Sequence, residues 1–116
     1  MSGDAAREER IVQNEVAFRA ANDSLKATFE DADEARGEVY PFLCECGDRR
    51  CTEVVLLTLQ AYESVRSHST RFVIRPGHKQ LESERQLDSG DGYEIIEKTG
   101  TAADLVLRAS QLPEQT

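Results

Sequence analysis

The sequence contains no tryptophan, and aromatic residues make up only 6% of its 116 residues. A chain of this length forms one domain with one modest hydrophobic core. With so few large side chains to bury, a core of this kind gains stability from an added cross-link such as a bound metal ion. The composition therefore predicts one small domain whose core is supplemented by such a cross-link.

The sequence also lacks any run of 18 or more apolar residues, and its first ten residues are polar and acidic. A membrane-spanning helix needs a longer apolar stretch, and a signal peptide needs an apolar central region. We therefore expect a cytoplasmic protein that does not enter the membrane.

No cysteine lies outside the eight residues from Cys44 to Cys51, which hold all three: Cys44, Cys46 and Cys51. An odd number of closely spaced cysteines cannot form a spread framework of disulfides. In a reducing compartment, such a cluster is more often a metal site.

Acidic residues are absent between Ser64 and Leu81, although the whole chain has a net charge of −8. The acidic total argues against broad, non-specific binding to nucleic acid or to an anionic membrane. The local excess of basic residues, together with two arginines in the cysteine loop, marks a candidate patch for an anion or a partner. This patch comprises Arg49, Arg50, Arg66, Arg71, Arg75 and Lys79.

The spacing C-x-C-x4-C is typical of a tight turn that brings thiolates to one zinc ion, at about 2.3 Å from each sulfur. The residue inside the C-x-C pair points away from the ion, so that both sulfurs reach it. Gly47, directly after the pair, can adopt a positive φ and bend the backbone towards the sulfurs. Arg49 and Arg50 can offset part of the negative charge of three thiolates.

Three cysteines leave one position of the zinc tetrahedron for another ligand. His78 is the favoured candidate, because it follows the turn Pro76-Gly77 and has a fixed backbone. The alternatives are His68, a carboxylate such as Asp48 or Glu53, a water molecule, or a residue from a partner. Two other uses of the cysteines also stay open, namely metal-free redox thiols and an iron–sulfur cluster, although ferredoxin spacings differ from this one.

The loop resembles the zinc knuckle that follows the SET domain in many protein lysine methyltransferases. The likeness covers the eight residues in which Cys44, Cys46, Gly47 and Cys51 match the pattern C-x-C-G-x-x-x-C. It implies that the fourth ligand comes from a distant part of the fold. It implies no methyltransferase activity, because the chain is short and no motif for the cofactor or for catalysis of that family is found.

From Phe42 to about Lys98 the chain also resembles small uncharacterised Cys3His-type proteins of high-GC bacteria. The shared features are F-x-C-E-C-G-D-x-x-C at Phe42 to Cys51, a helix at Leu59 to Arg66, and Pro76-Gly77-His78. This resemblance implies a metal-binding protein of bacterial type and assigns no activity.

The apolar periodicity predicts a long N-terminal helix from Ala5 to about Phe29, with its stripe at Ile11, Phe18 and Leu25. The charged residues of the opposite face, including Glu15 and Arg19, are expected to be in solvent. The stripe can pack on the protein's own core or pair with a second copy, with Asn14 setting the register, so a dimer through this helix stays open.

The remaining pattern predicts an α+β fold: a small antiparallel sheet and two further helices, held together by the zinc knuckle. Residues 1–38 form the helix and an acidic linker, residues 39–110 the zinc-stapled domain, and residues 111–116 a mobile tail. The expected strands are 39–44, 53–58, 71–75, 81–87 and 93–98, of which 53–58 is expected to be buried on both faces. Helices are expected at 59–67, capped by Thr58, and at 101–110, capped by Thr101.

A complete Cys3His site leaves zinc no open position for water, so an enzyme is not expected. The favoured hypothesis is a small non-catalytic zinc-binding module for interaction or regulation, with a protein partner. A thiol-redox or metal-responsive sensor is the second hypothesis. The third is a nucleic-acid-binding accessory protein that uses the basic segment, which the net charge disfavours.

Overall fold

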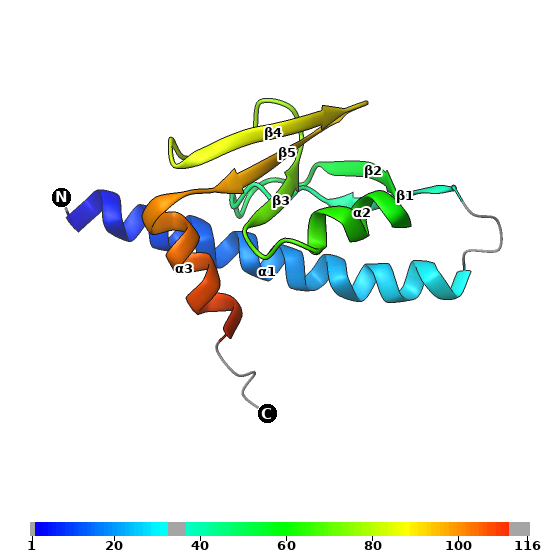
Figure 1. The fold of residues 1–116 in the computed structure, drawn as a ribbon, viewed down its shortest axis with the longest axis horizontal. Helices are drawn as coiled ribbons and strands as arrows, with labels where there is room; N and C mark the ends of the chain where they lie inside the picture. Colours follow the sequence, from blue (N-terminus) through cyan, green and yellow to red (C-terminus); the bar gives the residue numbers. More distant parts are fainter. Residues whose placement is uncertain (1, 33–36, 112–116) are drawn as a thin grey trace.

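The computed structural model describes residues 2–32 and 37–111 of the chain, and it contains three helices and five strands in these ranges. The long helix α1 runs along one side of the molecule, and the strands lie on the other side (Figure 1). In chain order the elements are α1 (Ser2–Ala32), β1 (Val39–Leu43), β2 (Val54–Thr58), α2 (Leu59–Arg66), β3 (Arg71–Ile74), β4 (Glu84–Gly90), β5 (Tyr93–Lys98) and α3 (Gly100–Gln111).

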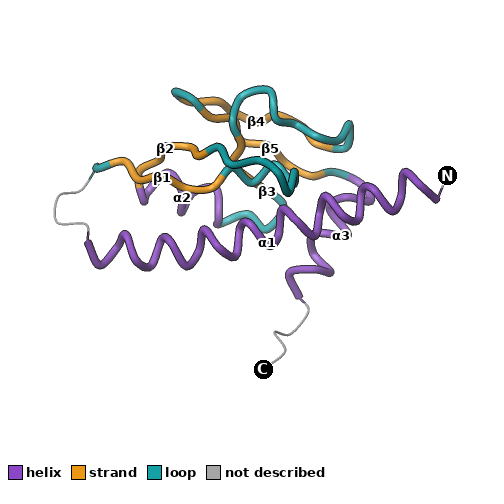
Figure 2. The backbone as a smooth tube through the Cα atoms, turned by 180° about the vertical axis from the view of Figure 1, so that it is seen from behind, coloured by secondary structure: helices purple, strands orange, loops and turns teal. Residues whose placement is uncertain are grey.

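The predicted α+β fold is confirmed, but the strands form two antiparallel sheets where one was expected. Strands β1 and β2 form a hairpin that carries the cysteines in its connecting loop, as predicted. The second sheet has the order β3-β5-β4, with both of its strand pairs antiparallel. Both sheets lie on the same side of α1, as the view from behind also shows (Figure 2).

Most predicted elements lie within a few residues of their observed positions. Strand β5 has the predicted bounds, and α2 is capped by Thr58, whose hydroxyl accepts a hydrogen bond from the Ala61 N–H at 3.1 Å. Strand β4 begins later than predicted, because Leu81 is followed by a turn. The cap predicted at Thr101 is wrong: α3 begins at Gly100, so Thr101 lies inside the helix.

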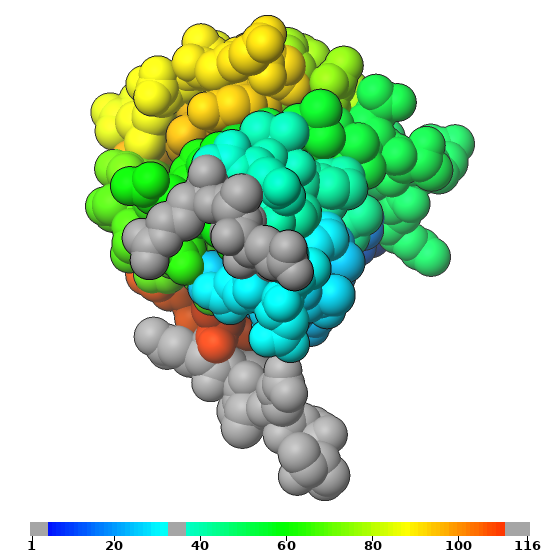
Figure 3. All heavy atoms as spheres, turned by 90° about the vertical axis from the view of Figure 1, so that its right-hand side faces the viewer, coloured from blue at the N-terminus to red at the C-terminus, as the bar shows by residue number. Residues whose placement is uncertain are grey.

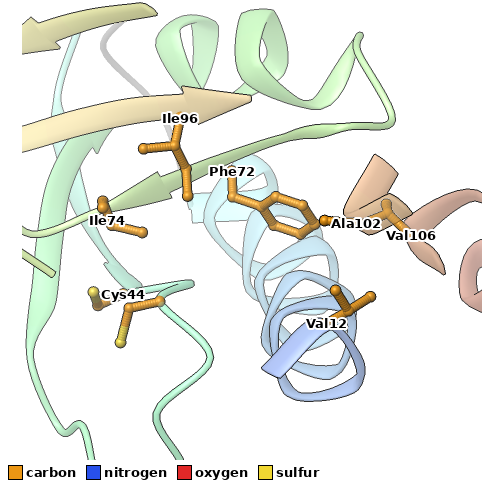
Figure 4. Close-up of a cluster of buried hydrophobic side chains, with 8 residues drawn as sticks. Val12, Cys44, Phe72, Ile74, Ile96, Ala102 and Val106 are labelled. Carbon is orange, nitrogen blue, oxygen red and sulfur yellow. The ribbon is translucent and has the colours of Figure 1, made fainter. Parts of the chain in front are cut away.

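One hydrophobic cluster joins the three-stranded sheet to two helices and to the cysteines. Phe72 lies between Ile96 of β5 and the helical residues Val12 and Val106, with Cys44 beyond Ile74 (Figure 4). Cys46 belongs to the same buried cluster. The metal-binding candidates therefore lie at the edge of the core and contribute to it.

A second cluster fills the space between the hairpin, α2 and β3. The rings of Phe42 and Tyr62 stack with centroids 4.4 Å apart, and Val73 packs against this cluster. Since Phe72 and Val73 are neighbours on β3, they point to opposite faces of the strand and belong to different clusters. Strand β3 therefore connects the two halves of the core. The end-on view shows the surface of this arrangement, with the end of α1 in light blue, β1 in cyan, β2 in green and β4 in yellow (Figure 3).

The prediction that residues 53–58 are buried on both faces of the strand is wrong. Val55 and Leu57 are buried, but Val54 and Leu56 on the other face are 42% and 54% exposed. The hairpin has only one layer of protein packed against it, and so its strands alternate between core and solvent.

The solvent exposure predicted for Glu15 and Arg19 on α1 is also wrong, because these side chains are 0% and 4% exposed. Each has a polar or aromatic partner inside the protein. Glu15 pairs with Lys98, and the guanidinium of Arg19 lies 4.6 Å from the centre of the Phe72 ring. Helix α1 is covered because α3 and β1 pack on it, and because Lys98 and Phe72 of the three-stranded sheet reach its charged residues.

Candidate metal centre

Four side chains from two separate loops converge on one point. The ligand atoms of Cys44, Cys46, Cys51 and His78 all lie within 4.8 Å of one another. The cysteines come from the loop between β1 and β2, and His78 comes from the loop between β3 and β4. Nδ1 of His78 lies 3.5 Å from the sulfur of Cys44 and 3.6 Å from that of Cys51.

These distances are those of ligands on one small ion. With zinc–sulfur and zinc–nitrogen bonds of about 2.3 and 2.0–2.1 Å, a tetrahedral site places sulfur and nitrogen about 3.6 Å apart. The Cys3His group therefore has the donor set and the spacing for a tetrahedral metal ion.

Gly47 allows the cysteine loop to pass close to α1. Its φ is +84°, as the sequence predicts, and a Cβ at this position would lie 2.7 Å from Cγ2 and 2.9 Å from the carbonyl oxygen of Ile11. The carbonyl of Gly47 accepts a hydrogen bond of 2.9 Å from the side chain of Asn14. Asn14, which interrupts the apolar stripe in the sequence, thus fixes the loop on the helix.

Glu45 points away from the sulfurs and into the protein, as expected for the middle residue of a C-x-C pair. Its carboxylate is fully buried and accepts hydrogen bonds from Asn22 at 2.8 Å and from the N–H of Val73 at 3.0 Å. Burial raises the pKa of Glu45 to about 7. Asn22 also pairs with both backbone groups of Leu43. These contacts fix the C-x-C pair between α1 and β3.

The Cys44 sulfur accepts a hydrogen bond of 3.2 Å from the backbone N–H of Arg75. The backbone N–H groups of Asp48 and Glu53 act to lower the pKa values of Cys46 and Cys51. Such groups favour thiolates and would also stabilise them around a metal ion.

The three sulfurs also act on one another. The Cys44 thiol donates a hydrogen bond to the Cys46 sulfur, which lowers the pKa of Cys46 to about 5. The same hydrogen bond, together with burial, raises the pKa of Cys44, and burial raises the pKa of Cys51. Cys46 is therefore the first of the three thiols to lose its proton, and a bound metal ion would displace the protons of the others.

The structure brings His78, and not His68, to the cysteines. The N–H of His78 donates to the carbonyl of Arg75 at 3.1 Å, which closes the turn through Pro76 and Gly77. His68 is exposed after α2, with its ring beside Ser67 and Arg71.

The two carboxylates considered as fourth ligands have other partners. Asp48 accepts a hydrogen bond of 2.9 Å from the N–H of Arg50, and Glu53 pairs with Arg75 at 3.6 Å. Neither belongs to the group of converging ligand atoms.

The residues of the predicted basic patch lie in different surroundings. Arg66 pairs with Asp23, Arg71 with Glu97 and Arg75 with Glu53, at 2.8, 3.4 and 3.6 Å. Lys79 donates to the carbonyl of Glu84 at 3.3 Å. Arg49 and Arg50 instead face the first turns of α1 and line a cavity there.

Sequence reasoning missed a second polar cluster, which is buried next to the cysteine loop. Nζ of Lys98 lies 2.6 Å from Oε2 of Glu15 and 2.6 Å from Oε1 of Glu84, and all three side chains are fully buried. The contact with Glu15 is an ion pair without hydrogen-bond geometry, since both oxygens of Glu15 lack a donor among the described residues. Burial raises the pKa of Glu15 to about 8. No local spacing marks these residues in a chain with 22 acidic side chains.

Comparison with protein-family models, with curated proteins and with solved structures gave no match for this chain. The likeness to the post-SET knuckle and to the bacterial Cys3His-type proteins stays a prediction. The helices in residues 2–32 and 37–111 do not reach the combined length and hydrophobicity of a membrane span. The tail from Leu112 lies outside the described residues.

Proposed function

We propose that this protein is a small non-catalytic zinc-binding module for interaction or regulation, with a structural Cys3His site formed by Cys44, Cys46, Cys51 and His78. The observation that carries the proposal is the convergence of these four ligand atoms within 4.8 Å, from two loops far apart in the chain. Thiolate and imidazole together are the donors that zinc prefers in structural sites.

A structural role follows from the ligand count. Four protein ligands complete the tetrahedron, so zinc has no open position for a substrate or for an activated water molecule. The ion would join the β1–β2 hairpin to the loop after β3, two segments that α2 and β3 separate in the chain. Zinc in this place orders a loop and stabilises the fold.

Metal analysis of the purified protein tests the proposal. We expect one zinc per chain in the wild type, greatly reduced zinc in His78→Ala, and full zinc in the control His68→Ala. His68 is exposed and outside the cluster, so its removal leaves the donor set unchanged. A wild-type protein without zinc, or a His78→Ala variant with full occupancy, contradicts the proposal.

A thiol-redox or metal-responsive sensor is the second candidate, and the partial exposure of the cluster supports it. Cys44 and Cys46 are buried, but Cys51 and His78 are half-exposed, so an oxidant in a reducing cytoplasm reaches Cys51 first. Release of zinc by dilute peroxide, reversed by a thiol reductant and fresh zinc, would favour this role. Thiols that stay inert in the folded protein would eliminate it.

A protein partner is part of the proposal, and the outer face of the hairpin supports it. Val39, Val54 and Leu56 are exposed there on two paired strands. A second copy of the chain is the simplest occupant for such a face. Light scattering of the wild type and of Leu56→Glu tests this: a dimer that becomes a monomer in the variant supports it, whereas a wild-type monomer contradicts it.

A further inference from the structure

A cavity of about 340 Å³ lies between the first turns of α1 and the cysteine loop. Arg7 and Arg10 line it from the helix, and Arg49 and Arg50 line it from the loop. Asp48 is the only acidic residue in the lining. Segments far apart in the sequence thus bring four guanidinium groups to one small space, in a chain whose net charge is −8.

None of these four arginines has an ion-pair partner among the described side chains, and in this they differ from six of the other nine described basic residues. Lys26, Arg66, Arg71, Arg75, Arg85 and Lys98 are all paired with carboxylates. Arg7 donates one hydrogen bond of 3.3 Å to the carbonyl of Gln80. An acidic chain offers many carboxylates, so unpaired arginines gathered in one cavity indicate that their negative partner comes from outside.

Both walls of the cavity are fixed in place. Arg7 and Arg10 are three residues apart on one helix, so their side chains leave the same face. The loop is held on α1 by the hydrogen bond from Asn14 to Gly47, and the N–H of Arg50 is bound to the carboxylate of Asp48. The charge of Asp48 is thereby engaged within its own loop, and the backbone that carries the four exposed arginines is held in place while their guanidinium groups stay free to meet a ligand.

We propose that this cavity binds a small molecule through a phosphate or diphosphate group. Guanidinium groups form paired, charge-assisted hydrogen bonds with phosphate oxygens, and several of them together suit a multiply charged anion. The volume is at the lower end of the range for small-molecule sites, which fits a phosphorylated compound of modest size. A long polyanion such as DNA is disfavoured, because acidic residues dominate the rest of the chain.

Isothermal titration calorimetry of the metal-loaded protein at low salt tests the proposal, with pyrophosphate, inorganic phosphate and a short single-stranded DNA as separate probes. We expect one pyrophosphate per chain, bound more tightly than inorganic phosphate if a diphosphate is the natural group. If inorganic phosphate binds as tightly, the site takes a single phosphate group. We expect DNA to bind weakly and to be displaced by pyrophosphate.

Variants locate the site. Arg7→Gln and Arg10→Gln lie on α1, away from the zinc ligands, and each should weaken pyrophosphate binding by about tenfold. Arg49→Gln should do the same if its zinc content is normal. Arg108→Gln is the matched control, because Arg108 is exposed on α3 and its loss changes the net charge equally. It should change the affinity by less than about twofold.

Three results would overturn the proposal. One is that neither pyrophosphate nor inorganic phosphate gives heat of binding. Another is that Arg108→Gln and Arg10→Gln lose equal affinity for pyrophosphate. The third is DNA that pyrophosphate cannot displace, which would assign these arginines to a nucleic-acid surface. Normal circular dichroism and zinc content in Arg7→Gln and Arg10→Gln ensure that a lost signal reflects the cavity and not the fold.

Discussion

Two clusters of polar side chains lie side by side in this domain, and they differ in the origin of their cation. In the cluster of Glu15, Lys98 and Glu84, the chain supplies the cation as the ammonium group of Lys98. The Cys3His cluster contains only donor atoms, so any cation in it would come from solution. The first cluster is complete when the chain folds, whereas the proposed zinc site would make stability depend on a metal ion.

The two clusters share the same structural neighbours. Val12 of α1 packs in the core cluster that contains Cys44 and Cys46, and Glu15 lies one turn further along the same helix. Gly47 of the cysteine loop approaches the side chain of Glu15. Loss of either cluster should therefore weaken the packing of α1 on the strands and lower the free energy of unfolding.

The largest effect should come from loss of Cys46, a ligand of the proposed zinc site. Cys46→Ala should lose zinc and reduce the free energy of unfolding by about 5 kcal/mol or more, because metal binding is coupled to folding. Thermal unfolding with and without a chelator measures this. The chelator should lower the melting temperature of the wild type towards that of the variant and leave the variant unchanged. If the chelator leaves the melting temperature of the wild type unchanged, the Cys3His group does not depend on a metal ion and the expected difference between the two clusters is contradicted.

Loss of Lys98 should have the next largest effect. Lys98→Met removes the cation from the buried carboxylate of Glu84 and the polar partner of Glu15, which its raised pKa keeps mostly protonated at neutral pH, and should cost about 3–5 kcal/mol of stability. Lys26→Met is the control, because Lys26 also contacts two carboxylates but at the surface, where a pair contributes about 0–1 kcal/mol. Urea unfolding of both variants measures the loss in free energy of unfolding. If Lys98→Met and Lys26→Met lose the same amount, the buried cluster contributes no more than a surface ion pair.

A smaller effect is expected at Gly47, where the loop meets α1. Gly47→Ala should cost about 1–2 kcal/mol for its positive φ and about 1–3 kcal/mol more for contact with Ile11 and Glu15. Gly92→Ala has nearly the same φ, and its Cβ would meet only one side-chain atom of Arg75 at 3.6 Å, so it should show the first cost alone. The difference between the two unfolding free energies isolates the close approach.

The smallest effect is a dependence of stability on pH. Glu15 has a pKa of about 8 in the folded protein, against 4.5 without burial. The folded state therefore holds a proton that the unfolded chain releases, and stability falls as pH rises through this range, by about 1–2 kcal/mol in the measured part of it from about pH 6.5 to about pH 8. Glu15→Gln has no such proton, so the difference in stability between the two proteins should change across this range. The zinc site contributes equally to both, and parallel pH profiles would contradict this prediction.

The cysteine loop was predictable because its signals are rare and local. Three cysteines, Gly47 after the C-x-C pair, and a histidine after Pro76-Gly77 each restrict the chain in a known way. The hairpin that carries the cysteines and the Thr58 cap were predicted for the same reason.

The buried charges of α1 could not be predicted, since glutamate and arginine usually mark a solvated face. Glu15 and Arg19 are buried because Lys98 and Phe72 lie against them, and these partners come from strands far along the chain. The exposure of Leu56 had a similar cause: an apolar run does not reveal how many layers will cover it.

The sequence by itself determined a single α+β domain with a long N-terminal helix, and it placed three cysteines and their turn residues so that one metal ion could join them. Only the tertiary structure decided that His78 completes the group, that Glu15 and Lys98 meet inside the core, and that Arg7 and Arg10 face Arg49 and Arg50. Local chemistry fixes the shape of a turn, but which distant side chains share one space depends on how the helix and the two sheets pack together.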